Sequence, residues 1–309
     1  MFQHTSLLVF TICLPLLLFA NSDRCQSIRF KNVVIFGDSY TDTDRVYKLS
    51  RRTWPASPPY YHGRFSNGPN WVDQLKVSHV KNYAYGGATT DNNLVQGYAK
   101  FGTIKVPGLR QQVEIFSNER GSSKLDPART LYILWITGND FFFNSSLAAA
   151  PEKVINSLLN SVKDLISFGA KNILLFNLFP GQYIPAAIAM YPAQLLSQVT
   201  AFFNAKLNVL VKEIQNLNPQ INLDMFNINS LLTKIFTTNS DYFTNTSGSC
   251  WNVTSPTSIQ KNCQDPNKYA FLDDRHFSSS VHGLIAEPIH QYLLPSYQLN
   301  TATCYVFKP

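Results

Sequence analysis

The sequence contains no internal repeat, no long low-complexity tract and no Gly/Ser- or Pro-rich linker between halves of different composition. These absences argue against a repeat architecture and against several domains joined by tethers. The chain has 309 residues, of which 45% are hydrophobic and 15% charged, so it is long enough to bury a sizeable core. We therefore expect one domain that covers residues 23–309.

Features typical of nucleic-acid-binding proteins are also missing. Basic residues are dispersed apart from the Arg51–Arg52 pair, and no RNA-recognition or zinc-finger pattern occurs. The formal net charge of +7 therefore indicates a solvated basic surface. The cluster of Asp38, Asp42 and Asp44 lacks the glycine and the distal glutamate of a calcium-binding EF-hand loop. We expect no nucleic-acid partner, no metal and no other cofactor.

The N-terminal segment contains no charged residue up to Ser22. Its apolar run, Leu7–Ala20, is shorter than the roughly 20 residues that span a bilayer and is interrupted by Pro15. The A-x-S ending at Ser22 has the pattern of a signal-peptidase site. We expect residues 1–22 to be a signal peptide and the mature protein to be secreted and extracellular, without a stable membrane anchor.

Cysteine usage agrees with an oxidising compartment. Cys13 lies in the leader, and an even number remains: Cys25, Cys250, Cys263 and Cys304. Cys250 with Cys263 would close a short loop and Cys25 with Cys304 would join the two ends, although other pairings are open. The Asn-x-Ser/Thr sequons that are candidate N-glycosylation sites are Asn144, Asn245 and Asn252.

Short apolar, β-branched runs alternate with helical patterns along the chain. The stretches Pro151–Gly169 and Leu195–Leu217 repeat apolar residues on one helical face. Strands that alternate with helices of this length predict an α/β fold with a parallel sheet. Ligands bind beyond the carboxyl ends of such strands, so candidate residues should follow them. The predicted strands are Asn32–Phe36, Leu131–Thr137, Asn172–Leu178 and Ile221–Phe226.

A serine and a histidine near opposite ends of the chain are the candidate reacting groups. Ser39 follows the first predicted strand in the sequence Gly-Asp-Ser-Tyr, although a serine in such a turn more often caps a helix. Asp273 precedes His276 by three residues, so one loop can orient its own histidine. A serine hydroxyl needs an imidazole to accept its proton and a carboxylate to fix the tautomer of that imidazole. The three residues fit these roles.

Acyl transfer also needs hydrogen-bond donors for the oxyanion that develops. The segment Asn82–Thr89 contains the adjacent glycines Gly86 and Gly87, whose backbone can approach a substrate closely. Asn139 follows a predicted strand and offers a side-chain amide. Either glycine meets the chemical requirement, and both segments also have the composition of ordinary turns.

The segments that carry Ser39, Gly86-Gly87, Asn139 and His276 resemble, in their order and in their local sequence motifs, those of the GDSL-type esterases and lipases, also called SGNH hydrolases. The resemblance runs from about Val33 to Ala286 and includes Gly63–Trp71 and Phe168–Leu178. It implies a three-layer α/β/α sandwich around a central parallel sheet. It also implies a serine ester hydrolase that forms an acyl-enzyme and needs no cofactor.

The resemblance assigns roles residue by residue. Ser39 becomes the nucleophile and the first oxyanion donor, and Asn139 becomes the third donor through its amide. Gly87 is the second donor, because it lies five residues after Asn82 as in the family.

Asp273 and His276 become the acid–base pair, since Asp273 has the D-x-x-H register that Asp274 lacks. The chain departs from the family pattern at Tyr40, which replaces the name-giving leucine, and at Thr137-Gly138, where Gly-x is usual. Neither departure removes a catalytic group. The second moves the freedom of a glycine by one position.

The segments Tyr40–Thr43 and Trp54–Trp71 are similar to those of secreted GDSL-type esterases that remove acetyl groups from plant cell-wall sugars. The implied substrate is a short-chain ester, with acetylated carbohydrate favoured. The alternative is a lipase, phospholipase or lipid acyltransferase of the same superfamily, in which the aromatic residues would line an acyl groove. A non-catalytic secreted binding protein on this scaffold is a third hypothesis. We expect a monomer, and the sequence does not tell whether residues 54–71 form a lid.

Overall fold

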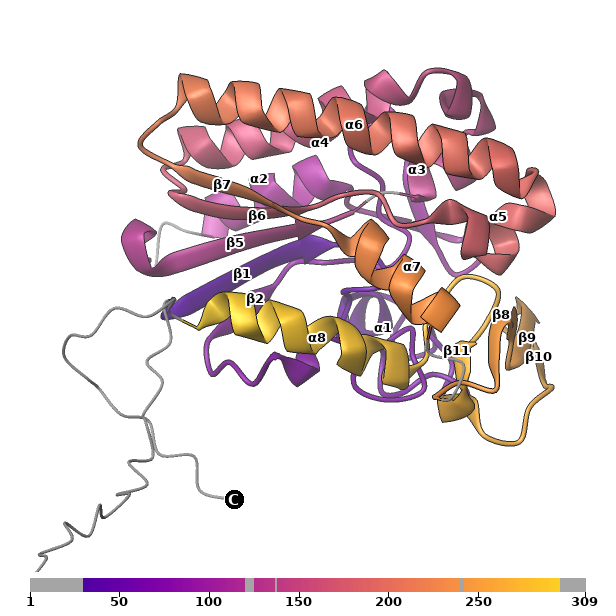
Figure 1. Cartoon of the computed structure of the whole chain (residues 1–309). Coiled ribbons are helices and arrows are strands. Elements are labelled where there is room, and N and C mark those ends of the chain that lie inside the picture. The colour runs from indigo at the N-terminus through magenta and orange to yellow at the C-terminus, as the bar shows by residue number, and fades with distance from the viewer. Residues whose placement is uncertain (1–29, 120–124, 137, 239–241, 295–309) are drawn as a thin grey trace, which may run out of the picture.

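The computed structural model describes residues 30–119, 125–136, 138–238 and 242–294. Its centre is a sheet with the strand order β2-β1-β5-β6-β7, in which every pairing is parallel. Helices cover both faces, so the predicted three-layer α/β/α sandwich is confirmed (Figure 1). The strands are β1 (Asn32–Gly37), β2 (Val80–Asn82), β5 (Thr130–Trp135), β6 (Asn172–Phe176) and β7 (Asn222–Phe226).

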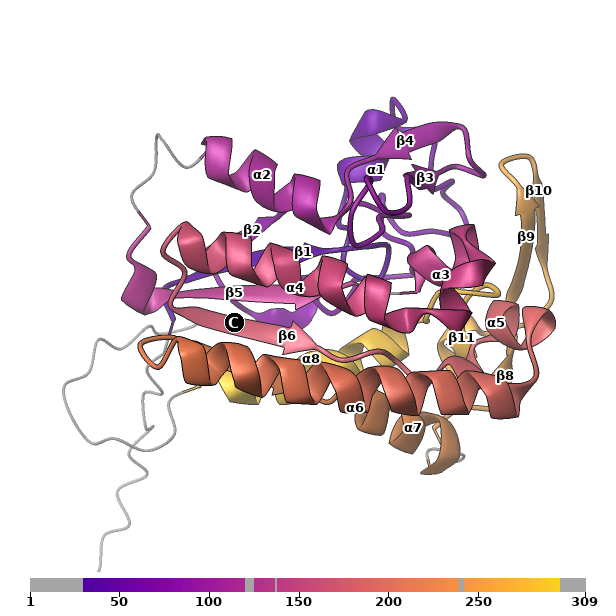
Figure 2. The ribbon, with the colours of Figure 1, turned by 90° about the horizontal axis from the view of Figure 1, so that it is seen from above.

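The two outer layers differ in the length and regularity of their helices. Helices α2, α4 and α6 lie over one face of the sheet, as the view from above shows (Figure 2). Helices α7 and α8 and the short α1 lie on the other side (Figure 1). The bounds are α1 (Arg45–Leu49), α2 (Leu109–Glu119), α4 (Pro151–Ser167), α6 (Ala193–Leu217), α7 (Ile228–Thr238) and α8 (Ser279–Leu293).

The central strands are buried because they are apolar on both faces. Every residue of β5 and β6 is buried, and so is every residue of β1 after Asn32. Trp135 ends β5 and Phe176 ends β6, and their rings pack with each other and with that of Trp71 at centroid distances of 5.0–5.9 Å. Burial of each such side chain contributes about 1.5–3 kcal/mol, which fixes the strand ends to which the loops are attached.

The two helices predicted from the sequence are present with nearly the predicted bounds. Helix α4 ends at Ser167, and Gly169 after it has a φ of +88°, a conformation that favours glycine. The edge strand β2 was missed, because its three residues are half-buried or exposed and carry no apolar run. The predicted strand end at Thr137 lies outside the described residues.

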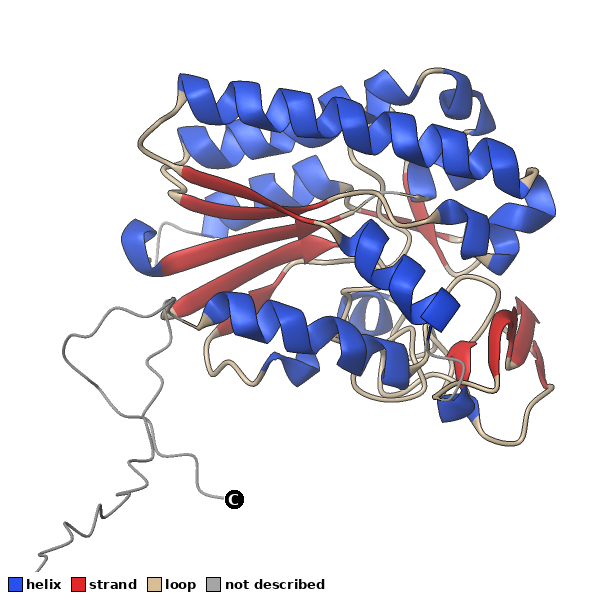
Figure 3. Cartoon of the chain, in the orientation of Figure 1, coloured by secondary structure: helices blue, strands red, loops and turns tan. Residues whose placement is uncertain are grey.

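Short strands and helices lie at the end of the molecule toward which the strands of the central sheet point (Figure 3). They include the strand pairs β3 with β4, β9 with β10 and β8 with β11. Their bounds are β3 (Gly97–Ala99), β4 (Ile104–Val106), β8 (Asn245–Ser249), β9 (Trp251–Ser255), β10 (Ser258–Lys261) and β11 (Tyr269–Phe271). The short helices at this end are α3 (Asn139–Phe143), α5 (Pro185–Met190), η4 (Ser145–Ala149), η5 (Gly181–Tyr183) and η6 (Pro266–Lys268), and the remaining ones are η1 (Asp73–Leu75) and η3 (Pro127–Arg129).

The structure joins Cys250 to Cys263 in a disulfide with a Cα–Cα distance of 4.9 Å, as predicted. The predicted Cys25–Cys304 pair and the predicted signal peptide, residues 1–22, lie outside the described residues.

Across the described ranges, no helix is both long and apolar enough to cross a membrane. The side chain of the candidate sequon residue Asn144 accepts a hydrogen bond from the backbone of its own turn.

Candidate active site

The candidate residues collect beyond the carboxyl ends of β1 and β5. The chain runs from β1 outward to β2 and then returns to β5 on the other side of β1. Such a reversal leaves a crevice at the strand ends, which is where ligands bind in open α/β sheets. Ser39 follows β1 and Asn139 follows β5, so the two residues lie at this crevice.

The turn that carries Ser39 is fixed by hydrogen bonds on both sides of Gly37. The Gln112 side chain accepts from the Gly37 N–H at 3.0 Å and donates to its carbonyl at 2.9 Å. A Cβ at position 37 would lie 2.6 Å from the Trp135 carbonyl oxygen, so only glycine fits. The chain then turns sharply, because the Thr41 and Asp42 N–H groups donate to the Asp38 carbonyl.

The structure brings Ser39, His276 and Asp273 into one hydrogen-bonded chain. The His276 Nε2 atom lies 2.9 Å from the Ser39 Oγ atom, although the residues are 237 positions apart. The His276 Nδ1 atom lies 2.7 Å from Asp273 Oδ2 and 2.9 Å from Oδ1. This geometry orients the imidazole so that its free nitrogen faces the serine hydroxyl.

The loop that carries His276 is organised around the Asp273 carboxylate. The backbone N–H groups of Arg275 and His276 both donate to Asp273 Oδ1 at 2.8 Å, and the Tyr60 hydroxyl donates to Oδ2 at 2.5 Å. Burial alone raises the pKa of Asp273, but the His276 charge and these hydrogen bonds outweigh it and leave the pKa lowered. The carboxylate is therefore held ionised beside the imidazole.

Asp274, the rival for the carboxylate role, lies elsewhere in the loop. Its side chain is 56% exposed and its nearest cation is Arg275, at 3.7 Å. Burial of part of the side chain and the charge of Asp273 raise the pKa of Asp274. Of the two adjacent carboxylates, Asp273 is the one in contact with the His276 imidazole.

Two hydrogen-bond donors near the Ser39 hydroxyl, the Gly87 N–H and the Asn139 amide, can accept a further partner. The Gly86 N–H already donates to Asp42 Oδ2 at 2.9 Å, whereas no acceptor within the described ranges meets the Gly87 N–H. The Asn139 amide donates one hydrogen to the Ala88 carbonyl at 2.9 Å, which holds the side chain and leaves its second hydrogen. All three predicted donor residues line one cleft together with His276.

Gly87 must be glycine for two reasons. Its φ is +84°, and a Cβ there would lie 2.0 Å from the Tyr98 carbonyl oxygen.

At Gly138, where the chain departs from the family pattern, φ is +120°. The shifted glycine thus serves a backbone conformation that other residues rarely adopt, while Thr137 lies outside the described residues.

Two buried carboxylates, Asp42 and Asp140, hold the donor loops in position. Neither was a candidate site residue in the sequence. Asp42, first considered as part of a calcium cluster, accepts from the backbone N–H groups that begin α1 and from Gly86. Asp140 accepts from the Thr90 N–H and, at 2.6 Å, from its hydroxyl. Burial raises the pKa of each carboxyl to about 6, against the lowering effect of these hydrogen bonds. The sequence signal was their position, since Asp42 lies three residues after Ser39 and Asp140 directly follows Asn139.

Tyr40, the other departure from the family pattern, joins the two halves of the site. Its hydroxyl donates to the Arg275 carbonyl at 2.8 Å, and its ring stacks on Phe277 with centroids 4.5 Å apart. A leucine could make neither the hydrogen bond nor the ring stack. The tyrosine therefore ties the turn of Ser39 to the loop of His276.

Two hollows open next to the Ser39 hydroxyl. The mixed cleft contains the reacting groups and carries charged residues on its walls: Lys100, Asp274 and Arg275. The junction hollow is smaller and shares Ser39, Asn139, Arg275 and His276 with the mixed cleft, and its other walls include Asp38, Gly138, Phe142 and Phe179. An ester bound at Ser39 could extend into both.

The aromatic segment at residues 54–71 contributes walls to the mixed cleft. Trp54, Tyr60 and Phe65 line this cleft, but each is at least 94% buried. Trp71 is fully buried in the core, and only Tyr61 is substantially exposed among these aromatic side chains. The segment therefore packs against the His276 loop, through Tyr60, and exposes little aromatic surface on which a sugar ring could stack.

Comparison with known proteins places this arrangement in a family. A family model for the GDSL-like lipases and acylhydrolases matches residues 33–289. The chain is 34% identical over 191 residues to a phosphatidylcholine-sterol acyltransferase from Aeromonas hydrophila, covering 60% of this chain and 55% of that protein. It is 31% identical over 139 residues to an acetylesterase from Hypocrea jecorina, covering 41% of this chain and 40% of that protein.

A third relative aligns along almost its whole length. The chain is 23% identical over 365 aligned positions to a GDSL esterase/lipase from Arabidopsis thaliana, covering 94% of this chain and 92% of that protein. The chain thus spans little more than half of the acyltransferase and less than half of the acetylesterase. Since the family model matches most of its length, the chain belongs to the GDSL-like lipase/acylhydrolase family of carboxylic ester hydrolases.

Proposed function

We propose that the protein is a serine carboxylic ester hydrolase, with Ser39 as nucleophile, His276 as general base and Asp273 as the carboxylate that orients it. The observation that carries the proposal is the continuous contact from Asp273 through the imidazole to the Ser39 hydroxyl, at 2.7 and 2.9 Å. Membership of an ester hydrolase family supports the same reaction.

The reaction follows from this contact in two half-reactions. The Ser39 Oγ atom attacks the ester carbonyl carbon while its proton passes to His276 Nε2. The tetrahedral intermediate then collapses, the C–O bond to the alcohol breaks, and the leaving oxygen takes the proton from the imidazole. Water attacks the acyl-enzyme with His276 again accepting a proton, and the carboxylic acid and free Ser39 are released.

The oxyanion of each tetrahedral intermediate needs donors that are already in place. The backbone N–H groups of Ser39 and Gly87 and the amide of Asn139 fill this role in the proposal. Each such donor contributes about 2.7–4 kcal/mol to the stabilisation of a transition state. Asp42 and Asp140 hold the donor loops before substrate arrives, so little reorganisation is needed.

The substrate has two candidates. Acetylated carbohydrate is favoured by the similarity to acetylesterases and by the mixed cleft, whose Lys100, Asp274 and Arg275 suit a polar alcohol portion. Esters with longer acyl chains, including lipids, are favoured by the similarity to the Aeromonas hydrophila acyltransferase and by the rings of Phe142 and Phe179 in the junction hollow. The two candidates differ in the acyl group, not in the reacting residues.

The setting of the enzyme is part of the proposal. Residues 1–22 act as a signal peptide, and residues 23–309 form one domain that works outside the cell as a monomer. The Cys250–Cys263 disulfide supports an oxidising compartment. N-terminal sequencing of secreted protein tests the leader, because a mature N-terminus elsewhere than residue 23 would contradict it. Mass spectrometry of glycopeptides tests Asn144, Asn245 and Asn252.

Replacement of the nucleophile tests the reaction itself. Ser39→Ala should lower kcat on p-nitrophenyl acetate by about 10⁴-fold or more, since the other triad members cannot act alone. A fluorophosphonate should label the native protein at Ser39, as read by peptide mass spectrometry. Ser66→Ala is the control, because Ser66 does not line the cleft and its hydroxyl has no hydrogen-bond partner among the described residues. Activity that survives Ser39→Ala would refute the proposal.

A further inference from the structure

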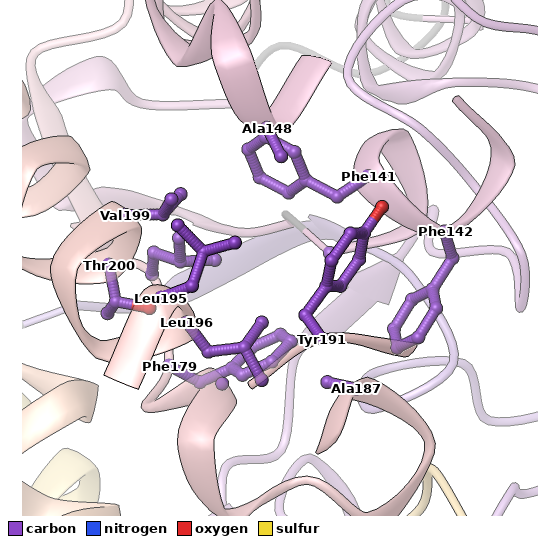
Figure 4. A pocket seen from close by; sticks show the side chains of 13 residues that line it. Phe141, Phe142, Ala148, Phe179, Ala187, Tyr191, Leu195, Leu196, Val199 and Thr200 are labelled. Atoms are coloured by element: carbon purple, nitrogen blue, oxygen red, sulfur yellow. The ribbon is translucent and has the colours of Figure 1, made fainter. Parts of the chain in front are cut away.

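A third hollow, here called the apolar pocket, lies beyond the junction hollow between α3, α5 and α6 (Figure 4). Side chains such as Phe141, Phe179 and Val199 form its walls. Among the described residues that line it none is charged, and only Tyr191 and Thr200 bring a polar side chain. A hollow of this composition favours an apolar ligand.

The apolar pocket adjoins the junction hollow and shares walls with it. Gly138, Phe142 and Phe179 line both, and the junction hollow also contains Ser39 and His276. A chain that ran from Ser39 into the apolar pocket would therefore pass these three shared residues.

Gly138 lets the ring of Phe179 pack against the backbone where the two hollows adjoin. A Cβ at position 138 would lie 2.8 Å from that ring, so any larger residue would displace it. The glycine that departs from the family pattern thus has a second consequence besides its backbone conformation. It sets the position of a ring that lines both hollows.

The outer rim of the apolar pocket is itself apolar. Leu195 lines the pocket and is 42% exposed, and Ile188 and Met190, which follow the lining residue Ala187, are also exposed. Exposed apolar side chains next to an apolar pocket indicate a binding surface rather than a core.

We propose that the apolar pocket binds the acyl chain of the substrate ester, so that the enzyme prefers acyl chains longer than acetyl. This inference rests on the proposed ester hydrolase function. The carbonyl group is held at Ser39, the alcohol portion occupies the mixed cleft with its charged residues, and the acyl chain extends past Phe142 and Phe179 into the apolar pocket. Burial of apolar surface in the transition state supplies the selectivity.

A series of p-nitrophenyl esters tests the inference, with acetate, butyrate and hexanoate below their critical micelle concentrations. The value of kcat/KM should rise about fourfold for each methylene group that enters the pocket. Butyrate should therefore be cleaved about fifteenfold faster than acetate at equal low concentration. The Ser39→Ala protein supplies the background for every ester.

A pocket-filling variant and a matched control locate the effect. Val199→Phe adds a ring to the wall of the apolar pocket and should lower the hexanoate-to-acetate ratio of kcat/KM at least tenfold. Val209→Phe makes the same change on the same helix at a site that is 50% exposed and outside the pocket, so it should leave the ratio unchanged. If Val199→Phe does not fold, Ala148→Leu fills the pocket from η4 instead.

Each outcome decides between the inference and the function on which it rests. Serine-dependent hydrolysis with acetate preferred, and a ratio unaffected by Val199→Phe, would overturn the acyl pocket and leave the ester hydrolase intact. If no ester is cleaved, the hydrolase proposal fails, and calorimetric titration with octanoate then tests the pocket alone. Binding that Val199→Phe weakens and Val209→Phe preserves would support the pocket, whereas no binding to the native protein would overturn it.

Discussion

The mixed cleft contains Ser39 and the apolar pocket lies beyond the junction hollow, and the walls of the two differ in chemistry. The mixed cleft is lined by loops, by α3 and by short strands, it carries charged residues that include Lys100 and Arg275, and it contains the reacting groups. The apolar pocket is built from helices α3, α5 and α6, and no charged residue is among its described lining residues. The contrast separates two tasks that one site performs, which are breaking the ester and choosing its acyl group.

This division explains why family membership predicts the reaction better than the substrate. The reacting groups are attached to the ends of β1 and β5 and to the loop before α8, which the fold itself brings together. The apolar pocket depends on side chains that α5 and α6 place beside the site, and such side chains vary without changing the fold. Substitutions in the shared groups should lower every rate equally, while those in one hollow should change ratios between esters.

The largest effect is expected at the carboxylate beside His276. Asp273→Asn should lower kcat about 10⁴-fold, since the imidazole loses the partner that fixes its tautomer. The loss should be equal for acetate and hexanoate esters. Asp274→Asn is the matched control and should cost less than tenfold, because its side chain is half exposed and bonds to no part of the imidazole. A larger loss for Asp274→Asn than for Asp273→Asn would show that the wrong carboxylate has been chosen.

A smaller but still uniform effect is expected at the amide donor. Asn139→Ala should lower kcat about 10²–10³-fold on both esters, because one oxyanion donor is removed from a preformed site. Asn93→Ala, an exposed asparagine outside the hollows, should leave kcat unchanged. A loss confined to the hexanoate ester would mean that Asn139 acts as a wall of the junction hollow and not as an oxyanion donor.

The sequence predicted the layers of the fold and which residues meet at the site, because both follow from local patterns. Apolar runs such as Asn172–Phe176 and the helix pattern after Pro151 encode their own burial. The placing of Ser39 and Asn139 at one site was predictable because both follow parallel strands that end at one edge of the sheet. His276 follows no strand of that sheet, and its contact with Ser39 was expected from the chemistry of a catalytic serine and from the family resemblance. The edge strand β2 was not predictable, since three half-exposed residues carry no periodic signal.

The supports of the site and its apolar pocket could not be predicted, because they depend on contacts between distant segments. Tyr60 reaches Asp273 across 213 positions, and Asp140 reaches Thr90 across 50. No local pattern distinguishes these side chains from ordinary core or turn residues. The apolar pocket likewise combines α3 with α6, and neither helix alone shows that its apolar face is partly uncovered.

The smallest effect on catalysis is expected at a residue outside both hollows, His282, which packs against Phe277 behind the His276 loop. Its ring is 1% exposed, and neither nitrogen has a hydrogen-bond partner among the described residues. Burial, with a smaller contribution from the charge of His276, lowers the pKa of His282 to about 3. The unfolded chain, with an ordinary histidine pKa near 6.5, therefore binds this proton first as the pH falls.

Stability should consequently decrease as the pH falls from about 6.5 toward 3, and this single group accounts for about 2 kcal/mol of the free energy of unfolding lost between pH 7 and pH 5. His282→Leu should remove that part of the pH dependence in urea unfolding at the two pH values, whereas His62→Leu, at an exposed site, should not. The hexanoate-to-acetate ratio should stay the same in both variants. A change in the ratio for His282→Leu would mean that the core behind the loop, and not only the walls of the apolar pocket, sets acyl selectivity.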